Sequence, residues 1–511
     1  MFVITPLILV FLSAFSFSFA LPNEFYPSGV PLGGFICLIP FFLALQQARS
    51  WKNGVFLGFI FGIAFHASSS WWLANFKDYA LWTLGATSVM YGCFYGFWSI
   101  VLQQVYTTNS RVKPIIIALL WTIIEWQKSS GYLAFPWGLL PYSVQSVPVL
   151  IQIADIGGIY GLSFLLALGN GALSQAIAEK KACIGNILVF FLLLLWTTVY
   201  GMLHLANPVP VNKKIPLVLV QHNIDQYSYP GEALESAISL SAKGTAFLKA
   251  QGTEPALVIW SETVLTEPYI GNRYFSGHKP VPFLEKNGVP VLLGAPLIFD
   301  EDDSSIANGA ILIGGGTVIS SYKKQKLIPF AETIPFADKK WMKGLMERFA
   351  GFSSFWTAGN ETAVMEISGL RFGAPICFED AFALLCRDFV KNGAEILVNL
   401  TNDSWSQSIS AQVQHLAAAR FRSIETRRTL VRSTNSGCTA VIDAQGRTIA
   451  ELPLFTAAFL AMEAPVYSGR PTVYFLLGNW FPVCSVLIVV WFFAFAKKTP
   501  PKRGFLINCF F

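Results

Sequence analysis

The sequence has little charge for its length. Of its 511 residues only 13% are Asp, Glu, Lys or Arg, whereas 53% are hydrophobic. A chain with so few charges and so many apolar residues does not fold as a single water-soluble globule. The composition therefore indicates a membrane protein that also carries a sizeable water-exposed part.

Clusters of basic residues are also lacking. The formal net charge is only +6, and Lys and Arg are dispersed rather than interleaved with aromatic residues along one stripe. Proteins that bind nucleic acid concentrate positive charge on one face because they must neutralise phosphates. The sequence thus argues against nucleic acid as a partner.

Spacings typical of metal ligands are missing as well. None of the five His forms an H-x-x-x-H pattern, and Cys377, Cys386 and Cys438 of the expected soluble region have no zinc-ligand spacing. The run Gly314–Gly316 is not followed by Gly-Lys-Ser/Thr, so we interpret it as a hairpin turn rather than a phosphate loop. We predict no metal and no organic cofactor, and the sequence leaves open whether Cys386 and Cys438 pair.

Long apolar runs account for the high hydrophobicity. Because the hydrocarbon core of a bilayer needs about 20 apolar residues per helix, we predict about eight membrane-spanning helices. They correspond to residues 1–20, 29–48, 54–76, 80–106, 113–126, 159–178, 183–206 and 472–496. The first run lacks the basic segment that normally precedes the apolar stretch of a signal peptide, so we interpret it as a membrane helix.

The short loops between these runs differ in charge from one side to the other. One side of the predicted arrangement holds Arg49, Lys52, Arg111, Lys113, Lys180, Lys181, Lys497, Lys498, Lys502 and Arg503. On the other side only Lys77 and Lys128 fall in short loops. By the positive-inside rule both termini lie in the cytoplasm and the long segment after the seventh helix lies outside, which in a bacterium is the periplasm.

Between residues 207 and 470 short β-rich runs alternate with helical patterns. We predict strands at 215–223, 256–260, 289–295, 309–320, 373–376, 394–399 and 429–443, and helices at 232–251, 380–392 and 410–427. This alternation is typical of an α/β sandwich. The expected organisation is a membrane domain at 1–206, a catalytic domain at 207–470, and an eighth membrane helix with a basic cytoplasmic tail at 471–511.

One thiol stands at a predicted corner between a strand and a helix. The apolar run Phe372–Ile376 leads to Cys377, and Glu379 and Asp380 open the following helical pattern. Backbone N–H groups at a helix start favour a thiolate, whereas the two acids oppose it, so a nearby cation must help. Taken alone, Cys377 also fits the commoner role of a small buried hydrophobe.

Two other segments place charged groups at strand ends. The apolar strand Ala256–Trp260 is followed by Glu262, and a hairpin-like stretch is followed by Lys324 and Glu332. Each of these charges would also fit an exposed strand end. His415 is a rival partner for the thiol, since a Cys–His pair is the main alternative chemistry. Its apolar neighbours on a helical face favour a role in the core or on the surface.

The order of these charged groups and the thiol along the chain resembles that of a known family. A Glu after a strand, then Y-x-K-x-x-L-x-P-F-x-E at 322–332, then I-C-[YF]-E at 376–379 is similar to the nitrilase superfamily. With the segments Thr401–Trp405 and Gln414–Arg420, and with apolar runs on both sides, nearly the whole chain resembles the apolipoprotein N-acyltransferase family. The resemblance implies α/β architecture together with polytopic membrane helices, in which a nitrilase-like αββα sandwich is inserted before the last helix.

The resemblance also implies roles and a reaction. Glu262 is expected as the general base, Lys324 as the cation beside the oxyanion, and Cys377 as the nucleophile. The supporting groups are Glu332, Phe378 through its backbone N–H, and Glu379. The implied reaction moves a fatty acyl chain from a membrane phospholipid, through a Cys thioester, to the N-terminal α-amine of diacylglyceryl-cysteine in a bacterial apolipoprotein.

Two alternative functions stay open at this point. One is a membrane-tethered nitrilase-type amidase with the same three groups and water as acceptor. The other is a transporter or scaffold whose outer domain only binds, which charges inside the membrane would favour; apart from Glu125, Lys77–Asp78 and cations at loop ends, the apolar runs lack them. The sequence departs from the common family pattern at Tyr229–Pro230, Phe378 and Ser406–Gln407, which affects expected substrate contacts more than the core chemistry.

Two further segments have aromatic character. Residues 127–158 form a long Pro/Gly-rich stretch on the side of the catalytic domain, and they fit either a functional loop or an interfacial aromatic belt. Residues 338–356 combine Lys with Trp, Met and Phe soon after Glu332. We interpret them as a segment resting among lipid headgroups, with an amphipathic packing helix as the alternative.

Overall fold

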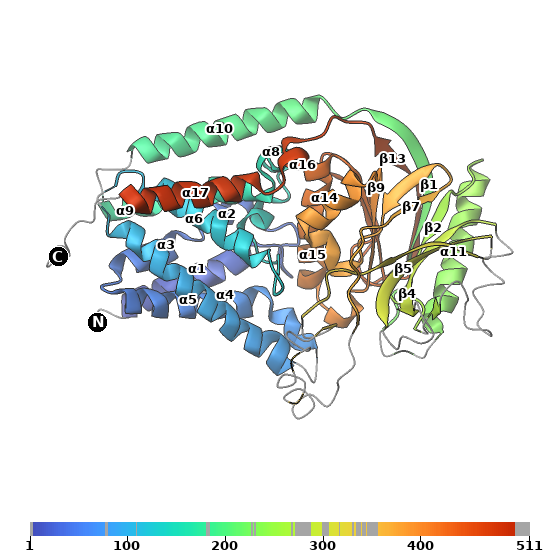
Figure 1. Cartoon of the computed structure of the whole chain (residues 1–511), viewed down its shortest axis with the longest axis horizontal. Coiled ribbons are helices and arrows are strands. Elements are labelled where there is room, and N and C mark those ends of the chain that lie inside the picture. Colours follow the sequence, from blue (N-terminus) through green and yellow to red (C-terminus); the bar gives the residue numbers. More distant parts are fainter. Residues whose placement is uncertain are drawn as a thin grey trace.

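Each of the apolar runs predicted to span a membrane contains helix in the computed structural model. The structure describes residues 4–76, 80–108, 110–179, 184–225, 228, 231–266, 269–270, 288–298, 306–315, 317–329, 332–333, 339, 344 and 356–495. Most of the predicted headgroup segment 338–356 lies outside these residues. The described chain has a helical part and a two-sheet part, joined end to end (Figure 1).

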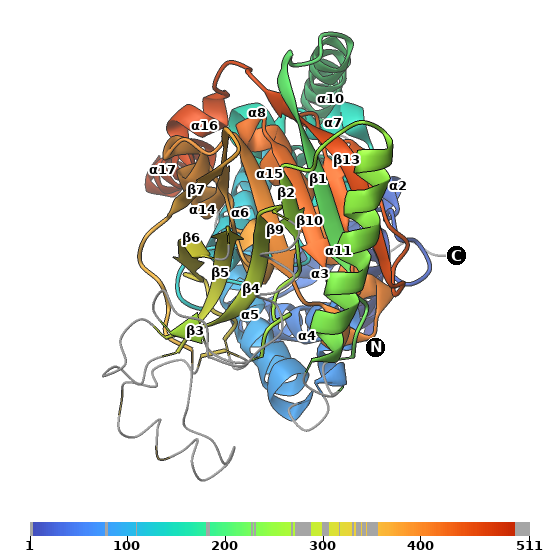
Figure 2. The ribbon, with the colours of Figure 1, turned by 90° about the vertical axis from the view of Figure 1, so that its right-hand side faces the viewer.

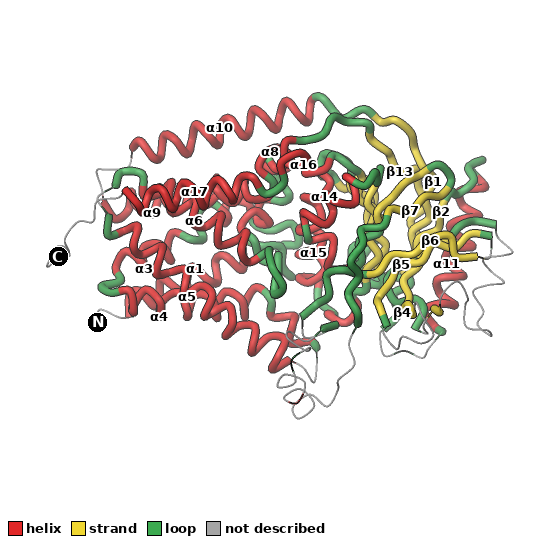
Figure 3. The backbone as a smooth tube through the Cα atoms, in the orientation of Figure 1, coloured by secondary structure: helices red, strands yellow, loops and turns green. Residues whose placement is uncertain are grey.

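The helical part is a bundle with its long axes roughly parallel (Figure 3). Its main helices are α1 (Ile4–Ala20), α3 (Ile39–Gln47), α4 (Trp51–Ser69), α5 (Thr87–Tyr106), α6 (Lys113–Lys128), α9 (Ile159–Glu179), α10 (Ile184–Ala206) and α17 (Trp480–Phe495). The short helices beside them are α2 (Pro31–Gly34), α7 (Pro148–Ile151), α8 (Ala154–Gly157) and α16 (Val473–Leu477). The C-terminal α17 packs against α6 and α9 and so completes the bundle.

Two helices of the described chain are long and apolar enough to cross a membrane by themselves, α9 and α10. Of the apolar window in α9, 67% is buried inside the molecule, whereas in α10 only 17% is buried. α10 lies along the outside of the bundle (Figure 1) and presents apolar side chains outward. A surface this apolar is unfavourable in water and suits contact with lipid. The number of membrane crossings itself stays a prediction.

The second part is a pair of stacked sheets (Figure 2). The first has the order β13-β1-β2-β4-β5-β6, with β3 paired to β4, and the second the order β12-β11-β10-β9-β8-β7. The strands of the first sheet are β1 (Val211–Gln221), β2 (Leu257–Ile259), β3 (Tyr269–Ile270), β4 (Val291–Ile298), β5 (Ala307–Gly314), β6 (Thr317–Lys323) and β13 (Ala458–Tyr467). Those of the second are β7 (Val364–Ile367), β8 (Leu370–Gly373), β9 (Ile396–Thr401), β10 (Thr429–Thr434), β11 (Ala440–Ile442) and β12 (Thr448–Glu451).

Alternate side chains of the first sheet point to opposite faces, and each face packs into a different hydrophobic core. Leu217, Leu219 and Ile259 face the second sheet, whereas Val218 and Trp260 face the helix α11 (Glu232–Ala250). On the other side, α14 (Ala383–Lys391) and α15 (Ile409–Thr426) cover the second sheet and separate it from the helical bundle (Figure 3). The layers are therefore helix, sheet, sheet, helix, as the predicted αββα sandwich requires.

Several predicted elements are wrong in detail. The predicted strand 309–320 is two strands, β5 and β6, joined by a tight turn in which Gly315 has φ +58°; only glycine adopts this conformation without strain. The predicted strand 429–443 is likewise two strands, β10 and β11, and the one predicted at 373–376 lies earlier, as β8. The predicted helix 380–392 begins only at Ala383, because residues 377–381 form a separate 3₁₀ turn.

Candidate active site

Three of the predicted site residues follow strand ends that meet at one edge of the sandwich. Glu262 comes soon after β2, Lys324 directly follows β6, and Cys377 follows β8 after the single bridge between Ile376 and Leu400. All three are buried. The structure therefore brings together three groups that are spread over more than a hundred residues of the chain, from Glu262 to Cys377.

Lys324 is held between two carboxylates. Its Nζ lies 3.1 Å from Glu262 Oε1 and 2.7 Å from Glu332 Oε1. Burial lowers the pKa of the Lys324 ammonium, but the charges of Glu262 and Glu332 outweigh it and hold that pKa well above its usual value. Lys324 is consequently a fixed positive charge, and it is not suited to accept a proton.

In addition to Lys324, two donors position Glu262 in its place after β2. Asn308 Nδ2 donates to Glu262 Oε1 at 2.7 Å and to Glu332 Oε1 at 3.0 Å. The backbone N–H of Asn402 donates to Glu262 Oε2 at 3.0 Å. A Cβ added to Gly294 would lie 2.6 Å from the Glu262 Cα, so only glycine allows β4 to approach this closely. Asn308 was not predicted, and its one signal in the sequence is an amide inside an otherwise apolar strand.

Cys377 stands at a sharp corner of the backbone. It is the first residue of the 3₁₀ turn Cys377–Ala381 and has φ +50°, a left-handed conformation that costs a non-glycine residue free energy. Its carbonyl oxygen accepts hydrogen bonds from Asn399 Nδ2 at 3.0 Å and interacts with His415 Nε2 at 3.3 Å. These contacts fix the corner, so that the side chain is presented at the strand end.

The Cys377 thiol is close enough to Glu262 and Lys324 for their charges to act on it. Burial raises the pKa of the thiol well above its usual value, the Glu262 carboxylate raises it further, and Lys324 opposes both. Backbone N–H groups at a helix start were expected to favour the thiolate with the help of a cation, but burial and the Glu262 carboxylate outweigh Lys324. The resting group is thus a thiol that needs an adjacent base to become a nucleophile.

Glu379 connects the thiol corner to the lysine loop. Its carboxylate accepts hydrogen bonds from the Tyr322 hydroxyl at 2.9 and 3.0 Å and from the backbone N–H groups of Gln325, Lys326 and Ile376 at 2.6, 2.9 and 2.8 Å. Burial raises the pKa of Glu379 to about 7, although these donors favour the ionised form. Its contacts are those of a positioning residue that places Lys324 opposite Cys377.

A polar network around His415 lies behind the corner. His415 Nδ1 lies 2.8 Å from Asp403 Oδ2, and its Nε2 lies 3.0 Å from Asp380 Oδ1. Asp380 is also paired with the buried Arg432. Since His415 meets the Cys377 carbonyl and two carboxylates, these contacts are those of a core residue rather than of a partner in a Cys–His pair. Asp403 lies in the segment Thr401–Trp405 that carries part of the resemblance, but no role was predicted for it.

The remaining cysteines of this part of the chain are free. The Cys386 thiol points to the Glu379 carbonyl at 3.8 Å, and the Cys438 thiol points to the Gln412 carbonyl at 3.6 Å. They form no disulfide with each other. Among the described residues there is also no cluster of three or more His, Cys, Asp or Glu that could hold a metal ion.

The loop 127–158 supplies aromatic side chains to the site. Trp137 is buried and stacks on Phe378 with ring centroids 5.5 Å apart, and it lies 5.1 Å from the His415 ring. Beside Phe378 is a cavity of about 270 Å³, lined also by Tyr132, Leu327 and Trp356. This loop was expected to be either a functional loop or an interfacial aromatic belt. Trp137 fits the first, because it is buried against the site, whereas a side chain in an interfacial belt faces lipid.

The comparisons with known proteins agree with this arrangement. The sequence model of the apolipoprotein N-acyltransferase N-terminal domain matches residues 13–172, and that of carbon-nitrogen hydrolase matches residues 283–464. The chain is 35% identical to apolipoprotein N-acyltransferase 2 of Treponema denticola, over 97% of this chain and 98% of that protein. It is 31% identical to apolipoprotein N-acyltransferase of Borreliella burgdorferi, over 90% of each.

Among solved structures, the chain is similar to Saccharomyces cerevisiae Nit3, a member of the nitrilase superfamily. The sequence identity is 17% and the TM-score 0.38, over 50% of this chain and 91% of Nit3, which is too loose to support a conclusion by itself. The relatives of full length are decisive, because the match at 35% identity runs through both the helical part and the two-sheet part. This chain belongs to the apolipoprotein N-acyltransferase family.

Proposed function

We propose that this protein transfers a fatty acyl chain from a membrane phospholipid to the N-terminal α-amine of diacylglyceryl-cysteine in bacterial apolipoproteins. The observation that carries the proposal is a buried thiol at a strained corner, next to a lysine held between two carboxylates. The domain that holds this site is covered on one side by apolar helices, which suits substrates that arrive from a bilayer.

In the first half-reaction Cys377 Sγ attacks the ester carbonyl carbon of the phospholipid. Glu262 accepts the thiol proton, and Lys324 with the backbone N–H of Phe378 stabilises the oxyanion. As the tetrahedral intermediate collapses, the bond to the leaving oxygen breaks and Glu262 returns the proton to it. The products are a lysophospholipid alcohol and an acyl thioester on Cys377.

In the second half-reaction the α-amine attacks the thioester carbonyl. Glu262 takes a proton from the amine and passes it to the departing sulfur, which restores the thiol. The product is an amide on the lipoprotein. The steps form a ping-pong sequence that needs no organic cofactor, and the same three residues, Glu262, Lys324 and Cys377, act in both halves.

The proposed placement follows from the charges of the loops. We propose that residues 1–206 form a membrane domain with seven spans, that residues 207–470 form the catalytic domain in the periplasm, and that residues 471–511 contain an eighth span and a cytoplasmic tail. The excess of Lys and Arg in the loops assigned to the cytoplasm supports this orientation of a multi-pass inner-membrane protein.

The direct test is intact-mass spectrometry of the purified full-length protein after incubation with phospholipid. We expect one fatty-acyl adduct on Cys377, which disappears when a diacylglyceryl lipopeptide with a free α-amine is added. The Cys377→Ala variant should form none, whereas Cys386→Ala and Cys438→Ala should form it normally. An adduct that persists in Cys377→Ala contradicts the proposal, and an adduct released by water alone at the same rate as by the lipopeptide favours the amidase alternative.

A further inference from the structure

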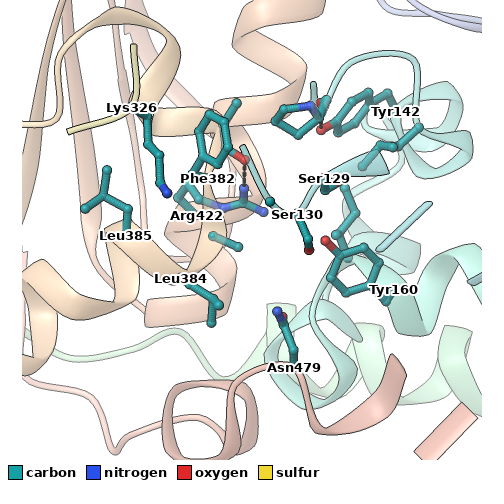
Figure 4. Close-up of a pocket in the computed structure, with 16 residues that line it drawn as sticks. Ser129, Ser130, Tyr142, Tyr160, Lys326, Phe382, Leu384, Leu385, Arg422 and Asn479 are labelled. Carbon is teal, nitrogen blue, oxygen red and sulfur yellow. Dashed lines mark hydrogen bonds between the residues drawn. The ribbon is translucent and has the colours of Figure 1, made fainter. Parts of the chain in front are cut away.

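A second cavity lies between the catalytic domain and the helical bundle. Its volume is about 150 Å³, and none of the three proposed catalytic side chains lines it. Its walls come from the stretch after α6, the start of α9, the start of α14, the helix α15 and the turn before α17 (Figure 4). Among the lining residues, the polar and charged ones include Ser129, Ser130, Lys326, Arg422 and Asn479.

Arg422 is the innermost charge of this cavity. Only 1% of the residue is exposed, its Nη1 donates to the Ala381 carbonyl at 2.6 Å, and its Nε lies 2.8 Å from Glu425 Oε2. Its Nη2 has no hydrogen-bond acceptor among the described residues. Figure 4 shows the guanidinium facing the space in front of Ser130 and Tyr160. A buried N–H without an acceptor is costly, so the cavity favours a ligand that brings an oxygen.

Lys326 makes the cavity positive overall. Glu425 offsets the charge of Arg422, but Lys326 is exposed at the edge, with its Nζ 5.8 Å from the centroid of the Phe382 ring. Among the described residues no carboxylate lies within ion-pair distance of Lys326 Nζ. A guanidinium N–H and an ammonium that line the same cavity suit an anion with several oxygens, of which phosphate is the common biological case.

The position of the cavity indicates where such a phosphate comes from. Three apolar helices meet here, because α6 ends at Lys128, α9 begins at Ile159 and α17 begins at Trp480. The ends of membrane helices lie at the depth of the lipid headgroups. Near Asn479, the side chains of Leu384, Leu476 and Leu477 are 43%, 59% and 60% exposed. An apolar rim of this kind is of no use to a small soluble anion and suits a lipid.

We propose that this cavity binds the headgroup phosphate of the phospholipid that donates the acyl chain, with Arg422 and Lys326 as its cationic contacts. The inference rests on the proposed function, since it concerns the donor of that reaction. Gly131, Lys326 and Phe382 line both this cavity and the one beside Phe378. A phosphate held here therefore leaves the glycerol ester directed toward the neighbour of Cys377.

The binding test uses full-length Cys377→Ala protein in detergent micelles and a diether phospholipid, which has no ester to react. Native mass spectrometry should show one retained lipid, and Lys326→Gln should weaken its binding by about tenfold, the loss of one charge-assisted contact. The matched control is Lys391→Gln, because Lys391 is an exposed lysine at the far end of α14, and it should bind as the parent does. Dialkylglycerol, which lacks the phosphate, should bind equally to all three proteins.

Equal binding of the diether phospholipid by the Lys326→Gln and Lys391→Gln variants would overturn the proposal. Inorganic phosphate serves as a separate probe. If its binding depended on Lys326 while that of the diether lipid did not, the site would belong to a free anion and the lipid assignment would be wrong. Because Arg422→Gln would leave Glu425 unpaired, Arg422→Lys is the variant for the inner wall, and its lipid binding should also weaken.

A kinetic test with Cys377 intact separates this inference from the proposed function. Lys326→Gln should raise KM for acyl transfer from a phospholipid by more than it raises KM for a short-chain ester without phosphate. If no ester of either kind forms an acyl adduct on the wild-type protein, the proposed function fails. If adducts form and the two KM values change equally, only the phosphate site fails.

Discussion

The charges around Cys377 work against one another. Lys324 favours the thiolate, while Glu262 and burial favour the thiol, so that the nucleophile is created only when Glu262 takes the proton during attack. This balance suits a site that must resist adventitious thiol chemistry while it waits for a membrane substrate. It also separates two measurable properties, the reactivity of the thiol and the rate of acylation.

The Glu262→Gln substitution should change these two properties in opposite directions. Removing the carboxylate removes one cause of the raised thiol pKa and leaves Lys324 less neutralised, so alkylation of Cys377 by iodoacetamide at pH 7 should become faster. Acylation by phospholipid should fall by a hundredfold or more, about the contribution of a general base. The measurements are labelled Cys377 by peptide mass spectrometry and adduct formation against time.

The control for this experiment is Glu254→Gln, which removes an exposed carboxylate shortly before β2 and should change neither rate. A Glu262→Gln protein in which both rates fell together would indicate collapse of the site instead of loss of a base.

Glu379 should give the enzyme an acidic limb in its pH profile. The pKa of this carboxyl is raised to about 7, so protonation begins as the pH falls through 7 and removes acceptors from the lysine loop. Acylation should therefore rise with pH through this range. Stability should change in the opposite sense, because the folded state binds more protons than the unfolded state between the ordinary Glu pKa and 7, so the free energy of unfolding falls as the pH rises across that window.

In Glu379→Gln the acidic limb of the pH profile should disappear. Acylation should also be at least about tenfold slower than in the wild type at every pH, because a buried amide leaves some of the hydrogen-bond donors around residue 379 unpaired. Glu366→Gln, on the exposed face of β7, serves as the control and should keep the profile of the wild type. A limb near pH 7 that persisted in Glu379→Gln would assign it to another group.

Glu262, Lys324 and Cys377 were predicted together from the resemblance to the nitrilase superfamily, because strand ends alone left each of them with an ordinary structural role. Asn308 was missed, and the contacts of His415 could not be predicted, although a role in the core or on the surface was expected for it. An amide in a strand and an imidazole on a helix have many ordinary uses, and only the folded structure shows that one bridges Glu262 and Glu332 while the other lies behind Cys377.

At the scale of elements, the joint between the two parts of the molecule depends on buried polar contacts. Arg427, at the end of α15, donates to Asp155 of α8 at 2.5 Å and to Gln152 Oε1 at 2.7 Å. Gln152 in turn donates to the Gln445 carbonyl at 2.9 Å. These bonds tie the segment before α9 to the catalytic domain.

Asp155→Asn should therefore destabilise the joint. Removing one partner leaves the Arg427 guanidinium buried without its counter-charge, which costs about 3–5 kcal/mol in comparable cases. We expect a lower Tm and faster limited proteolysis between the helical part and the catalytic domain. The matched control is Lys249→Gln, which breaks the exposed pair with Glu254 and should cost no more than about 1 kcal/mol. Equal losses of stability in the two variants would contradict this account.

The elements were predictable where one physical signal dominates. Long apolar runs are helical as expected, because a helix satisfies its own backbone hydrogen bonds in a bilayer or in a buried core. The helix α11 starts at the predicted residue, Glu232. β13 was missed because it lies at an edge, is only half buried over much of its length and contains Pro465, so it lacks the continuous apolar run of a central strand. Thr429–Asp443 was predicted as one strand although Asn435–Gly437 carries the residues of a turn.

At the scale of the whole molecule, the prediction concerns its orientation in the membrane. We predict that residues 207–470 lie outside and both termini inside, from the asymmetry of the loop charges. Reporter fusions after Gly359 and after Arg503 check it: a reporter active only in the periplasm should work at the first position and a reporter active only in the cytoplasm at the second. A cytoplasmic signal from Gly359 would contradict both the orientation and the proposed lipoprotein substrate.

The pairing of β1 with β13 has a consequence for the order in which the protein is made. β1 is the first strand of the catalytic domain to leave the ribosome and β13 is the last. The two are nevertheless antiparallel neighbours, with Val211 paired to Tyr467 and Gln221 paired to Ala458. Until residue 467 has emerged, one edge of β1 has no partner and is open to pairing with other chains. Completion of the domain is therefore tied to the arrival of the segment just before α17, and a ribosome that stalls earlier leaves a catalytic domain with all three of Glu262, Lys324 and Cys377 but an unclosed sheet.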